Sequence, residues 1–264
     1  MTDDLITGVK HPAVAATRAD LAGGRDAAAF LVDGRRLVTR AIEARAAVRR
    51  VFLLDPVDPD LAPLREAVAA AGVTCLRVRR GVFFKLLGLG YETSVRVLAV
   101  VDRPRPADVT RPADRDACVL VGERIQDPRN VGVMVRTAEG FGLPAAVFSA
   151  DSADPWCRAA VRSSTGSILR LPLGVAVEMP GYLSRLKRAG FRVIGSSAAG
   201  STLCRDADLG GRCALLLGNE SDGLSAEARR LCDAVVSIPL PGGAHSYNVT
   251  VAAGILLYER ARRG

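Results

Sequence analysis

The sequence predicts an α/β protein in which a mostly parallel-sheet domain follows a smaller α/β domain. Short apolar runs alternate with segments of helical spacing along both halves, and this alternation is typical of α/β folds. Three runs in the second half, Phe191–Gly195, Cys213–Leu217 and Ala234–Ile238, are largely apolar, as strands of a buried parallel sheet are. Between the halves lies a segment of different composition, residues 102–116.

The first domain is expected to span residues 1–101. Ala29–Asp33 is predicted to be a strand, and apolar residues at helical spacing predict a helix over Arg35–Ala47. A second helix over Leu61–Ala71 should end at Gly72, because glycine adopts the left-handed conformation that closes helices. The other elements expected here are strands at 51–54, 73–78 and 95–101 and a helix at 81–87.

The segment 102–116 is interpreted as an extended linker. It reads DRPRPADVTRPADRD, with three prolines and little apolar bulk. Proline fixes its own φ and restricts the residue before it, which favours extended backbone.

The second domain is expected to span residues 117–264. Cys118–Gly122 and Ala145–Phe148 are predicted to be strands, in addition to the three largely apolar runs. The helices expected in this domain lie at 131–141, 181–189, 226–231 and 247–262, the third of them with Ser225 as its N-cap.

The charges exclude several kinds of chemistry. The chain has 264 residues and a net charge of +8, but only Lys10, Lys85 and Lys187 among its 36 basic residues are lysines. None precedes Ser or Thr, which excludes a phosphate-binding loop of the Walker type, and His11 and His245 cannot form H-E-x-x-H. No G-x-S-x-G nucleophile elbow occurs. We therefore expect no metal site and none of these enzyme classes.

The six cysteines and the N-terminal residues indicate a cytoplasmic protein. No two cysteines form a C-x-x-C pair, so the spacing argues against zinc ribbons and thioredoxin-type sites. Residues 1–10 contain two aspartates and no apolar run, and no stretch approaches the length of a membrane span. We expect a reduced, soluble, cytoplasmic protein without a membrane partner.

Three polar segments follow strands of the second domain. Ligands of open α/β sheets bind beyond the carboxyl ends of strands, so these segments form the natural site. In the first, Asn130 is predicted to be the N-cap of the next helix, and Arg136 lies six residues on. Both side chains could point at an anionic or hydroxylic substrate; a capped helix with a surface arginine is the plainer interpretation, and the segment alone favours it.

The second segment, Gly218–Ser225, reads GNESDGLS and follows an apolar strand. Its glycines allow a tight turn, and Glu220 between them is poorly placed for a merely solvated charge. An ordinary turn is the alternative.

The third segment, residues 239–248, is a Pro- and Gly-rich loop in which Ser246 and Asn248 are placed to cap the last helix. His245 on this loop is interpreted as a solvated side chain.

Together the three segments resemble the ordered motifs of the TrmH/SpoU ribose methyltransferases. The matching residues are Asn130 with Arg136, then LGNE at 217–220 with GL at 223–224, then Ile238-Pro239 with SYNVTVA at 246–252. Residues 161–173, VRSSTGSILRLPL, resemble the family's intervening segment, and the likeness covers essentially all of 117–264. Residues 29–45 resemble, more loosely, the family's ribosomal-protein-like RNA-binding extension.

The resemblance implies a fold, a cofactor and partners. It implies a trefoil knot in the last third of the catalytic domain, a homodimer with the active site near the subunit interface, and S-adenosylmethionine held in the knot loops. It implies that Gly195–Ala198 is a third cofactor loop. The cofactor residues that it implies are Leu217, Gly218, Asn219, Ile238, Leu240, Tyr247 and Val249, and the catalytic residues are Asn130, Arg136, Glu220, Ser246 and Asn248.

Within this resemblance, roles follow from side-chain chemistry. Arg136 suits electrostatic activation of a ribose 2′-hydroxyl, because a guanidinium clamps phosphate and rarely gives up its proton. Ser246 and Asn130 would orient the ribose, and Glu220 would position Arg136 or the loop. Tyr247 and Thr250 depart from the family's usual leucine and serine; the tyrosine ring puts the pose of the cofactor in question, and the threonine keeps a hydroxyl.

The implied activity is methyl transfer to a ribose 2′-hydroxyl in structured RNA, with ribosomal RNA favoured over tRNA because of the accessory domain. Arg35, Arg36, Arg79 and Arg80 are candidate RNA contacts, although solvated surface is the favoured interpretation of each pair. Lys10 and Arg18, on what we expect to be a mobile N-terminal arm, are further candidates. The alternatives are a non-catalytic RNA-binding or ribosome-assembly factor, against which the intact catalytic group argues, and an enzyme that methylates a small-molecule hydroxyl.

Overall fold

A computed structural model describes residues 5–88, 93–104 and 116–263 in two compact units. Unit 1 consists of residues 1–103 and the segment Trp156–Leu169, and unit 2 consists of residues 104–155 and 170–264. Most of the predicted linker, residues 105–115, lies outside the described residues. Each unit contains one sheet. No helix within the described ranges is both long and apolar enough to span a bilayer.

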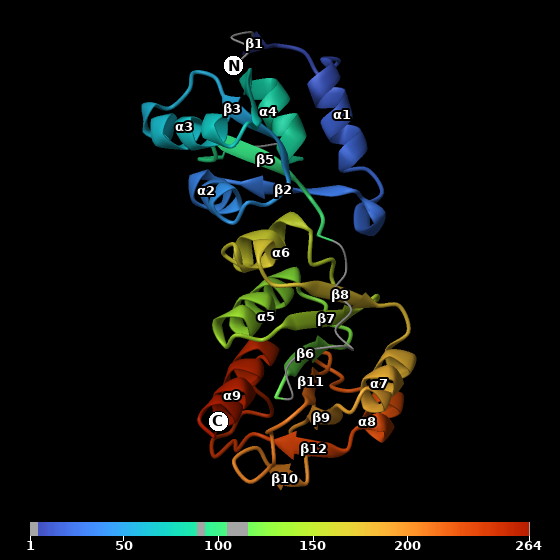
Figure 1. Cartoon of the computed structure of the whole chain (residues 1–264). Coiled ribbons are helices and arrows are strands. Elements are labelled where there is room, and N and C mark those ends of the chain that lie inside the picture. The colour runs from blue at the N-terminus through green and yellow to red at the C-terminus, as the bar shows by residue number, and fades with distance from the viewer. Residues whose placement is uncertain (1–4, 89–92, 105–115, 264) are drawn as a thin grey trace. The chain divides into compact units, whose positions relative to one another are not determined.

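Unit 1 is a three-layer α/β structure around a mixed sheet with strand order β1-β4-β3-β5-β2. β1, β4 and β3 run parallel, and β5 pairs antiparallel with both β3 and β2. In Figure 1, α1 and α4 lie on one side of this sheet and α2 and α3 on the other. The elements are β1 (Leu5–Ile6), α1 (Pro12–Asp20), β2 (Ala29–Asp33), α2 (Arg35–Glu43), β3 (Val48–Leu54), α3 (Ala62–Ala70), β4 (Thr74–Val78), α4 (Arg80–Leu87) and β5 (Val97–Asp102).

The elements predicted in this half are all present, with shifted ends, and one helix was not predicted. α1 begins at Pro12, where His11 caps the helix by accepting a hydrogen bond from the Ala13 N–H. Val14 and Thr17 on this helix are buried. The prediction that Arg18 lies on a mobile arm is therefore wrong, since Arg18 belongs to a packed helix.

The segment Trp156–Leu169 belongs to unit 1 although it comes from the middle of the second half of the chain. The Trp156 ring packs on Phe30 with centroids 4.8 Å apart. α6 (Arg158–Ser163) brings two arginines to Asp33, whose side chain is fully buried. One oxygen of Asp33 accepts hydrogen bonds from Arg158 at 2.7 and 3.1 Å and from Arg162 at 2.9 Å. These charges fix the segment on the end of β2.

Unit 2 contains a parallel sheet with strand order β10-β12-β9-β11-β6-β7-β8. In Figure 1, α5 and α9 lie on one side of the sheet and α7 and α8 on the other. The elements are β6 (Cys118–Gly122), α5 (Pro128–Gly140), β7 (Ala145–Ser149), β8 (Leu173–Ala176), α7 (Met179–Arg188), β9 (Arg192–Ser196), β10 (Thr202–Leu203), β11 (Cys213–Leu217), α8 (Ala226–Leu231), β12 (Ala234–Ser237) and α9 (Val249–Ala261).

The α/β class and the mostly parallel sheet predicted from the sequence are confirmed. β11 lies at the centre of the sheet, with Cys213 opposite Cys118 of β6 and opposite Arg192 of β9. The five residues of β11 and the five of β6 are all buried, as their apolar composition predicts. After β12 the chain returns to the other side of the centre, where α9 packs on α5 and β11. This return brings the last loop of the chain close to the beginning of α5.

Candidate active site

A cavity of about 380 Å³ lies in unit 2, beyond the carboxyl ends of β9, β11 and β12. The loop after each of these strands forms a wall, and the first turn of α9 closes the space. Its volume falls within the roughly 300–1,000 Å³ typical of small-molecule pockets. The lining residues are Ser196–Ala199, Leu217–Gly223, Ile238, Leu240, His245–Tyr247, Val249 and Ala252.

The loop after β11 is held in a tight turn. The backbones of Asn219 and Gly223 pair in both directions at 3.0 Å. The Asn219 side-chain oxygen accepts hydrogen bonds from the Ser221 and Asp222 N–H groups, and its amide donates to the Arg124 carbonyl at 2.9 Å. A Cβ on Gly218 would lie 2.2 Å from the carbonyl carbon of Gly223, so only glycine fits there. The sequence at 218–223 therefore determines the shape of this wall.

Three of the predicted catalytic residues form a continuous hydrogen-bonded chain. The Asn130 amide donates to a Glu220 carboxylate oxygen at 2.8 Å. The Asn248 amide in turn donates to the Asn130 side-chain oxygen at 3.3 Å. These residues come from α5, the loop after β11 and the loop after β12, so the contacts join three distant parts of the sequence.

Glu220 is held as a carboxylate. Burial disfavours its charged form, but hydrogen bonds from Asn130 and from the backbone N–H groups of Gln126 and Asp127 outweigh burial, and the pKa of Glu220 lies below its ordinary value. The backbone donors belong to the turn that begins α5, where a negative charge is favoured. Glu220 thus contacts Asn130 and this turn, and not Arg136.

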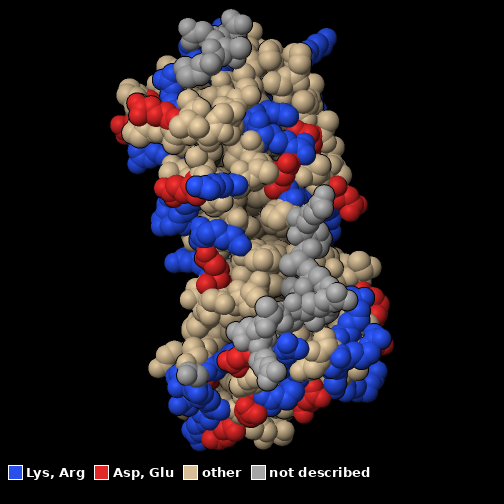
Figure 2. Space-filling model, in the orientation of Figure 1, with Lys and Arg blue, Asp and Glu red and all other residues tan. Residues whose placement is uncertain are grey.

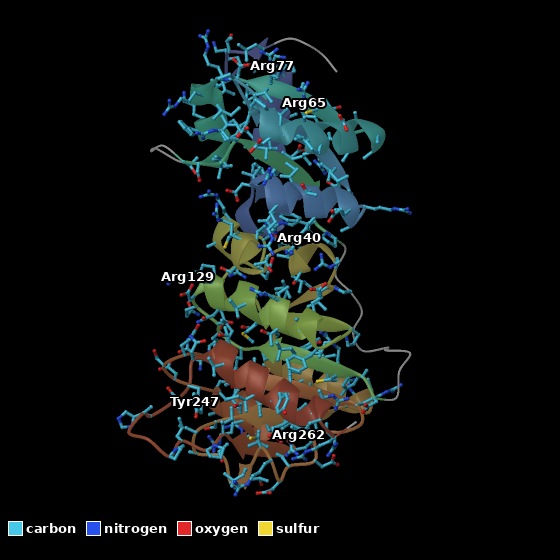
Figure 3. All side chains as sticks on the ribbon, turned by 90° about the vertical axis from the view of Figure 1, so that its left-hand side faces the viewer. Arg40, Arg65, Arg77, Arg129, Tyr247 and Arg262 are labelled. Atoms are coloured by element: carbon cyan, nitrogen blue, oxygen red, sulfur yellow. The ribbon has the colours of Figure 1, made fainter. Side chains whose placement is uncertain are left out.

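Asn130 is free to make these contacts because it does not cap α5. Asp127 is the N-cap, accepting a hydrogen bond from the Arg129 N–H at 2.8 Å, and Pro128 occupies the first helical position. The prediction that Asn130 is the N-cap is therefore wrong. The side chain of Asn130 lies in the first turn and reaches outward instead. Figure 3 shows Arg129, at the same end of α5, on the same side of unit 2 as Tyr247.

The loop after β12 ends in a side-chain cap. The Asn248 oxygen accepts hydrogen bonds from the Thr250 N–H at 2.9 Å and from the Thr250 hydroxyl at 2.6 Å, so Asn248 alone caps α9. The Tyr247 hydroxyl donates to the Pro239 carbonyl at 3.2 Å and joins the two ends of the loop. Tyr247, which replaces the leucine usual in the family, thus has a structural role in this chain. Thr250, which replaces a serine, donates its hydroxyl to Asn248.

Arg136 lies apart from this group. It is exposed on α5 and does not line the cavity. Six residues separate it from Asn130, which places the two side chains about 120° apart around the helix. Within one chain, the structure therefore brings together Asn130, Glu220, Ser246 and Asn248 near the cavity, without Arg136.

All the predicted cofactor residues line the cavity, as do Ser196–Ala198 of the predicted third loop. The apolar side chains Leu217, Ile238, Leu240 and Val249 and the adjacent polar backbone fit a ligand with a flat ring and a polar chain, such as S-adenosylmethionine. His245 is exposed, as expected of a solvated loop residue, and it also lines the cavity, which the sequence analysis did not anticipate. Its position directly before Ser246 was the available signal.

The candidate RNA-binding arginines are in unit 1. Arg35 and Arg36 form the first turn of α2, which has no side-chain cap, and Arg35 lines a cavity of about 260 Å³ with Arg96 and Arg162. Arg79 and Arg80 begin α4, where the Arg80 guanidinium lies 5.5 Å from the centre of the Phe84 ring. Asp33, Asp58 and Asp60 line the same cavity, so its arginines and acids are balanced in number. Arg35 therefore belongs to a concave site of mixed charge, whereas Arg80 packs on its own helix.

Comparisons with known proteins show the family to which the chain is similar. Residues 117–258 match the model of the SpoU rRNA Methylase family. The chain is 33% identical over 251 residues to an uncharacterized tRNA/rRNA methyltransferase of Mycobacterium tuberculosis, covering 94% of this chain and 85% of that protein. It is 30% identical over 232 residues to the 23S rRNA (guanosine(2553)-2'-O)-methyltransferase RlmP of Bacillus subtilis, covering 87% of each.

Two solved structures cover nearly the whole chain. The AdoMet-bound rRNA methyltransferase from Sinorhizobium meliloti is 26% identical, with a TM-score of 0.80 over 98% of this chain and 97% of that one. The SpoU methyltransferase AviRb from Streptomyces viridochromogenes, in complex with AdoMet, is 29% identical, with a TM-score of 0.80 over 94% and 96%.

Proposed function

The chain belongs to the SpoU rRNA methylase family and is an S-adenosylmethionine-dependent RNA methyltransferase, and from that premise we propose that it methylates a ribose 2′-hydroxyl of ribosomal RNA at the cavity of unit 2. The observation that carries the proposal is the hydrogen-bonded chain of Glu220, Asn130 and Asn248 beside that cavity. It presents amide groups that can orient a hydroxyl next to a pocket for the methyl donor.

The cofactor would be held by the three loops of the cavity. S-adenosylmethionine supplies an electrophilic methyl group on a sulfonium when it is bound. Gly218 and Asn219 offer backbone groups from the loop after β11, and Leu217, Ile238, Leu240, Tyr247 and Val249 also line the cavity. Tyr247 also fixes its loop through Pro239, so the wall is formed before the ligand enters.

Arg136 would bind the RNA phosphate beside the reacting ribose and stabilise negative charge that develops on the hydroxyl oxygen. Ser246 and Asn130 would orient the ribose, and Glu220 would position Asn130. Since Arg136 does not line the cavity of its own chain, we propose that a second copy supplies it in a homodimer. α9 exposes Val251 by 46% and Tyr258 by 60%, seven residues apart and thus on one face, which is a suitable contact for that copy.

Ribosomal RNA is favoured over tRNA for two reasons. RlmP, one of the relatives, acts on 23S rRNA by its name, and unit 1 adds a second folded unit whose surface carries exposed arginines, among them Arg35 and Arg36. Basic residues also gather over α7 and α8 of unit 2 (Figure 2), among them Arg185, Arg188 and Arg230. Both units therefore offer cations to a large folded RNA.

We place the protein in the cytoplasm, because its cysteines are free thiols and ribosomal RNA is found there. We also propose that the last third of the catalytic domain forms the trefoil knot that the resemblance implies.

Replacement of Arg136 by alanine tests the proposed function. We expect the methylation rate to fall more than about tenfold, or roughly 1.4 kcal/mol in the activation free energy. The substrate is total RNA from a strain that lacks this protein, and the methylated nucleotide is mapped as an alkali-resistant linkage. A variant within tenfold of the parent would contradict the role of Arg136, and a methyl group on tRNA would contradict the choice of RNA.

Co-expression of Arg136→Ala with Glu220→Ala tests the homodimer. If Arg136 serves the cavity of a second copy, heterodimers regain one intact site, and activity exceeds that of either variant alone. Calorimetry with S-adenosylmethionine separates the enzyme from a non-catalytic scaffold, which would show no binding even with RNA present.

A further inference from the structure

The transfer of a methyl group to a hydroxyl requires a group that accepts the hydroxyl proton. An efficient acceptor has a pKa near the working pH and lies within reach of the reacting oxygen. The described residues around the cavity offer few such groups. Assigning one of them rests on the proposed function, because the assignment concerns the same reaction.

The residues of the hydrogen-bonded chain are poor proton acceptors. Glu220 already accepts hydrogen bonds from Asn130, Gln126 and Asp127, and its pKa is lowered by them. Asn130 and Asn248 carry neutral amides, and Ser246 carries a hydroxyl, none of which takes up a proton near neutral pH. Arg136 does not line the cavity of its own chain.

His245 is the imidazole that lines this cavity. It directly precedes Ser246 on the loop after β12, and this loop is anchored at both ends by the bond from Tyr247 to Pro239. The loop ends at Asn248, the last member of the hydrogen-bonded chain. The imidazole is exposed and lines the cavity on the same loop that carries Ser246 and Asn248.

We propose that His245 accepts the proton of the ribose 2′-hydroxyl during methyl transfer. The O–H bond breaks as the new O–CH₃ bond forms, and the proton passes to the neutral imidazole, which becomes imidazolium. The imidazolium thereby carries the positive charge that was on the sulfonium. It afterwards releases its proton to water. No oxidant or metal takes part in this step.

The other charged groups at the cavity are few. The loop after β11 contributes Glu220 and Asp222, and the loop of His245 itself contributes the Tyr247 phenol. Ser196–Ala199 and the first turn of α9 contribute hydroxyl, methyl and backbone groups.

The test compares His245→Asn with His11→Asn, the matched control. Asn keeps a polar side chain at 245 without a base, and at His11 it keeps an N-cap on α1. Single-turnover methylation of total RNA from a strain that lacks this protein is measured with saturating S-adenosylmethionine between pH 5 and pH 9. The parent and His11→Asn should lose rate towards acid pH, because a protonated imidazole cannot accept the hydroxyl proton.

His245→Asn should be at least about a hundredfold slower at pH 7.5 and should lack that acid limb, with unchanged affinity for S-adenosylmethionine. Added imidazole should restore rate to His245→Ala in proportion to its free-base concentration. An active parent whose His245→Asn variant stays within about threefold, or keeps the acid limb, overturns the inference. So does a His245→Asn variant that no longer binds the cofactor, because His245 would then act in binding. A parent that methylates no RNA refutes the proposed function itself, and the inference with it.

Discussion

The Asn130 amide donates a hydrogen bond to the Glu220 carboxylate at 2.8 Å across 90 positions of the chain. This contact joins the first turn of α5 to the loop after β11, and it orders Asn130 for the next bond to Asn248. Two of the predicted catalytic residues thus hold each other in place. The contact also has a predictable dependence on pH.

Glu220→Gln should destabilise the protein at neutral pH and not at acid pH. Because the pKa of Glu220 is lowered in the folded chain, its carboxylate adds stability above the ordinary value of 4.5, and this contribution is lost as the pH falls through the folded pKa. Thermal melts should show parent and variant apart at pH 7 and converging progressively as the pH falls below 4.5. Glu227→Gln, at an exposed acid of α8, is the control. A gap between parent and variant that does not narrow as the pH falls would contradict the role of the charge.

Gly218→Ala should weaken cofactor binding. Its Cβ would lie 2.2 Å from the Gly223 backbone, so the loop after β11 would have to move, at a cost of about 1–3 kcal/mol. We expect the affinity for S-adenosylmethionine to fall at least about tenfold by calorimetry. Gly140→Ala is the control, because a Cβ at Gly140 meets nothing within 4 Å. Equal affinities for the two variants would show that the loop does not hold the cofactor.

Tyr247→Phe should weaken cofactor binding by about threefold, through loss of an exposed hydrogen bond to the Pro239 carbonyl. Tyr247→Leu, which installs the residue usual in the family, loses the same bond and should be at least as weak. The dissociation constants of both variants are compared with that of the parent. If Tyr247→Phe binds as the parent does, the hydroxyl does not organise the loop.

Asp33→Ala should lower the stability of unit 1. The change leaves Arg158 and Arg162 facing each other without their carboxylate. Breaking a buried pair costs roughly 3–5 kcal/mol, and we expect about 3 kcal/mol because the Arg162 side chain is 52% exposed. Urea denaturation measures the change, with Asp26→Ala, at an exposed acid of the same unit, as reference. A loss below about 1 kcal/mol would mean that the arginines find water instead.

The double variant Arg35→Ala/Arg36→Ala should weaken RNA binding more than Arg79→Ala/Arg80→Ala. Arg35 lines the 260 Å³ cavity of unit 1 together with Arg96 and Arg162. The Arg80 guanidinium instead packs over the Phe84 ring. We expect a shallower dependence of log K on log salt, by about one unit for each phosphate that the two arginines neutralise in the parent, and an unchanged affinity for S-adenosylmethionine. Equal effects from the two pairs would place the RNA elsewhere on unit 1.

Strands were the elements best predicted from the sequence. Cys118–Gly122 and Cys213–Leu217 match β6 and β11 residue for residue, because continuous apolar runs with polar neighbours have clear ends. Helix starts were harder to predict. Asp127 and Asn130 lie close together in the sequence, and both residue types can cap a helix. Asp127 is the cap because Asn130 is bonded to Glu220, and the local sequence does not show that contact.

Strand order and the grouping of distant segments were not predictable from the local pattern. The position of β11 between β6 and β9 depends on pairing across 95 residues, and periodicity carries no such information. The cavity was found through the family resemblance, which pointed to the three loops that line it. His245 was missed because an exposed loop histidine has no pattern that sets it apart.

The grouping of Trp156–Leu169 with unit 1 has a consequence for how such proteins can change over evolution. The chain passes from one unit to the other after Arg103, after Pro155 and after Leu169, so the N-terminal unit is not a module joined at a single point. A foreign domain joined at residue 104 would not supply the carboxylate of Asp33, which pairs with Arg158 and Arg162. It would also not supply Phe30, on which Trp156 packs. The two parts of this chain are therefore expected to be inherited together, with exchange of one requiring compensating changes inside the other.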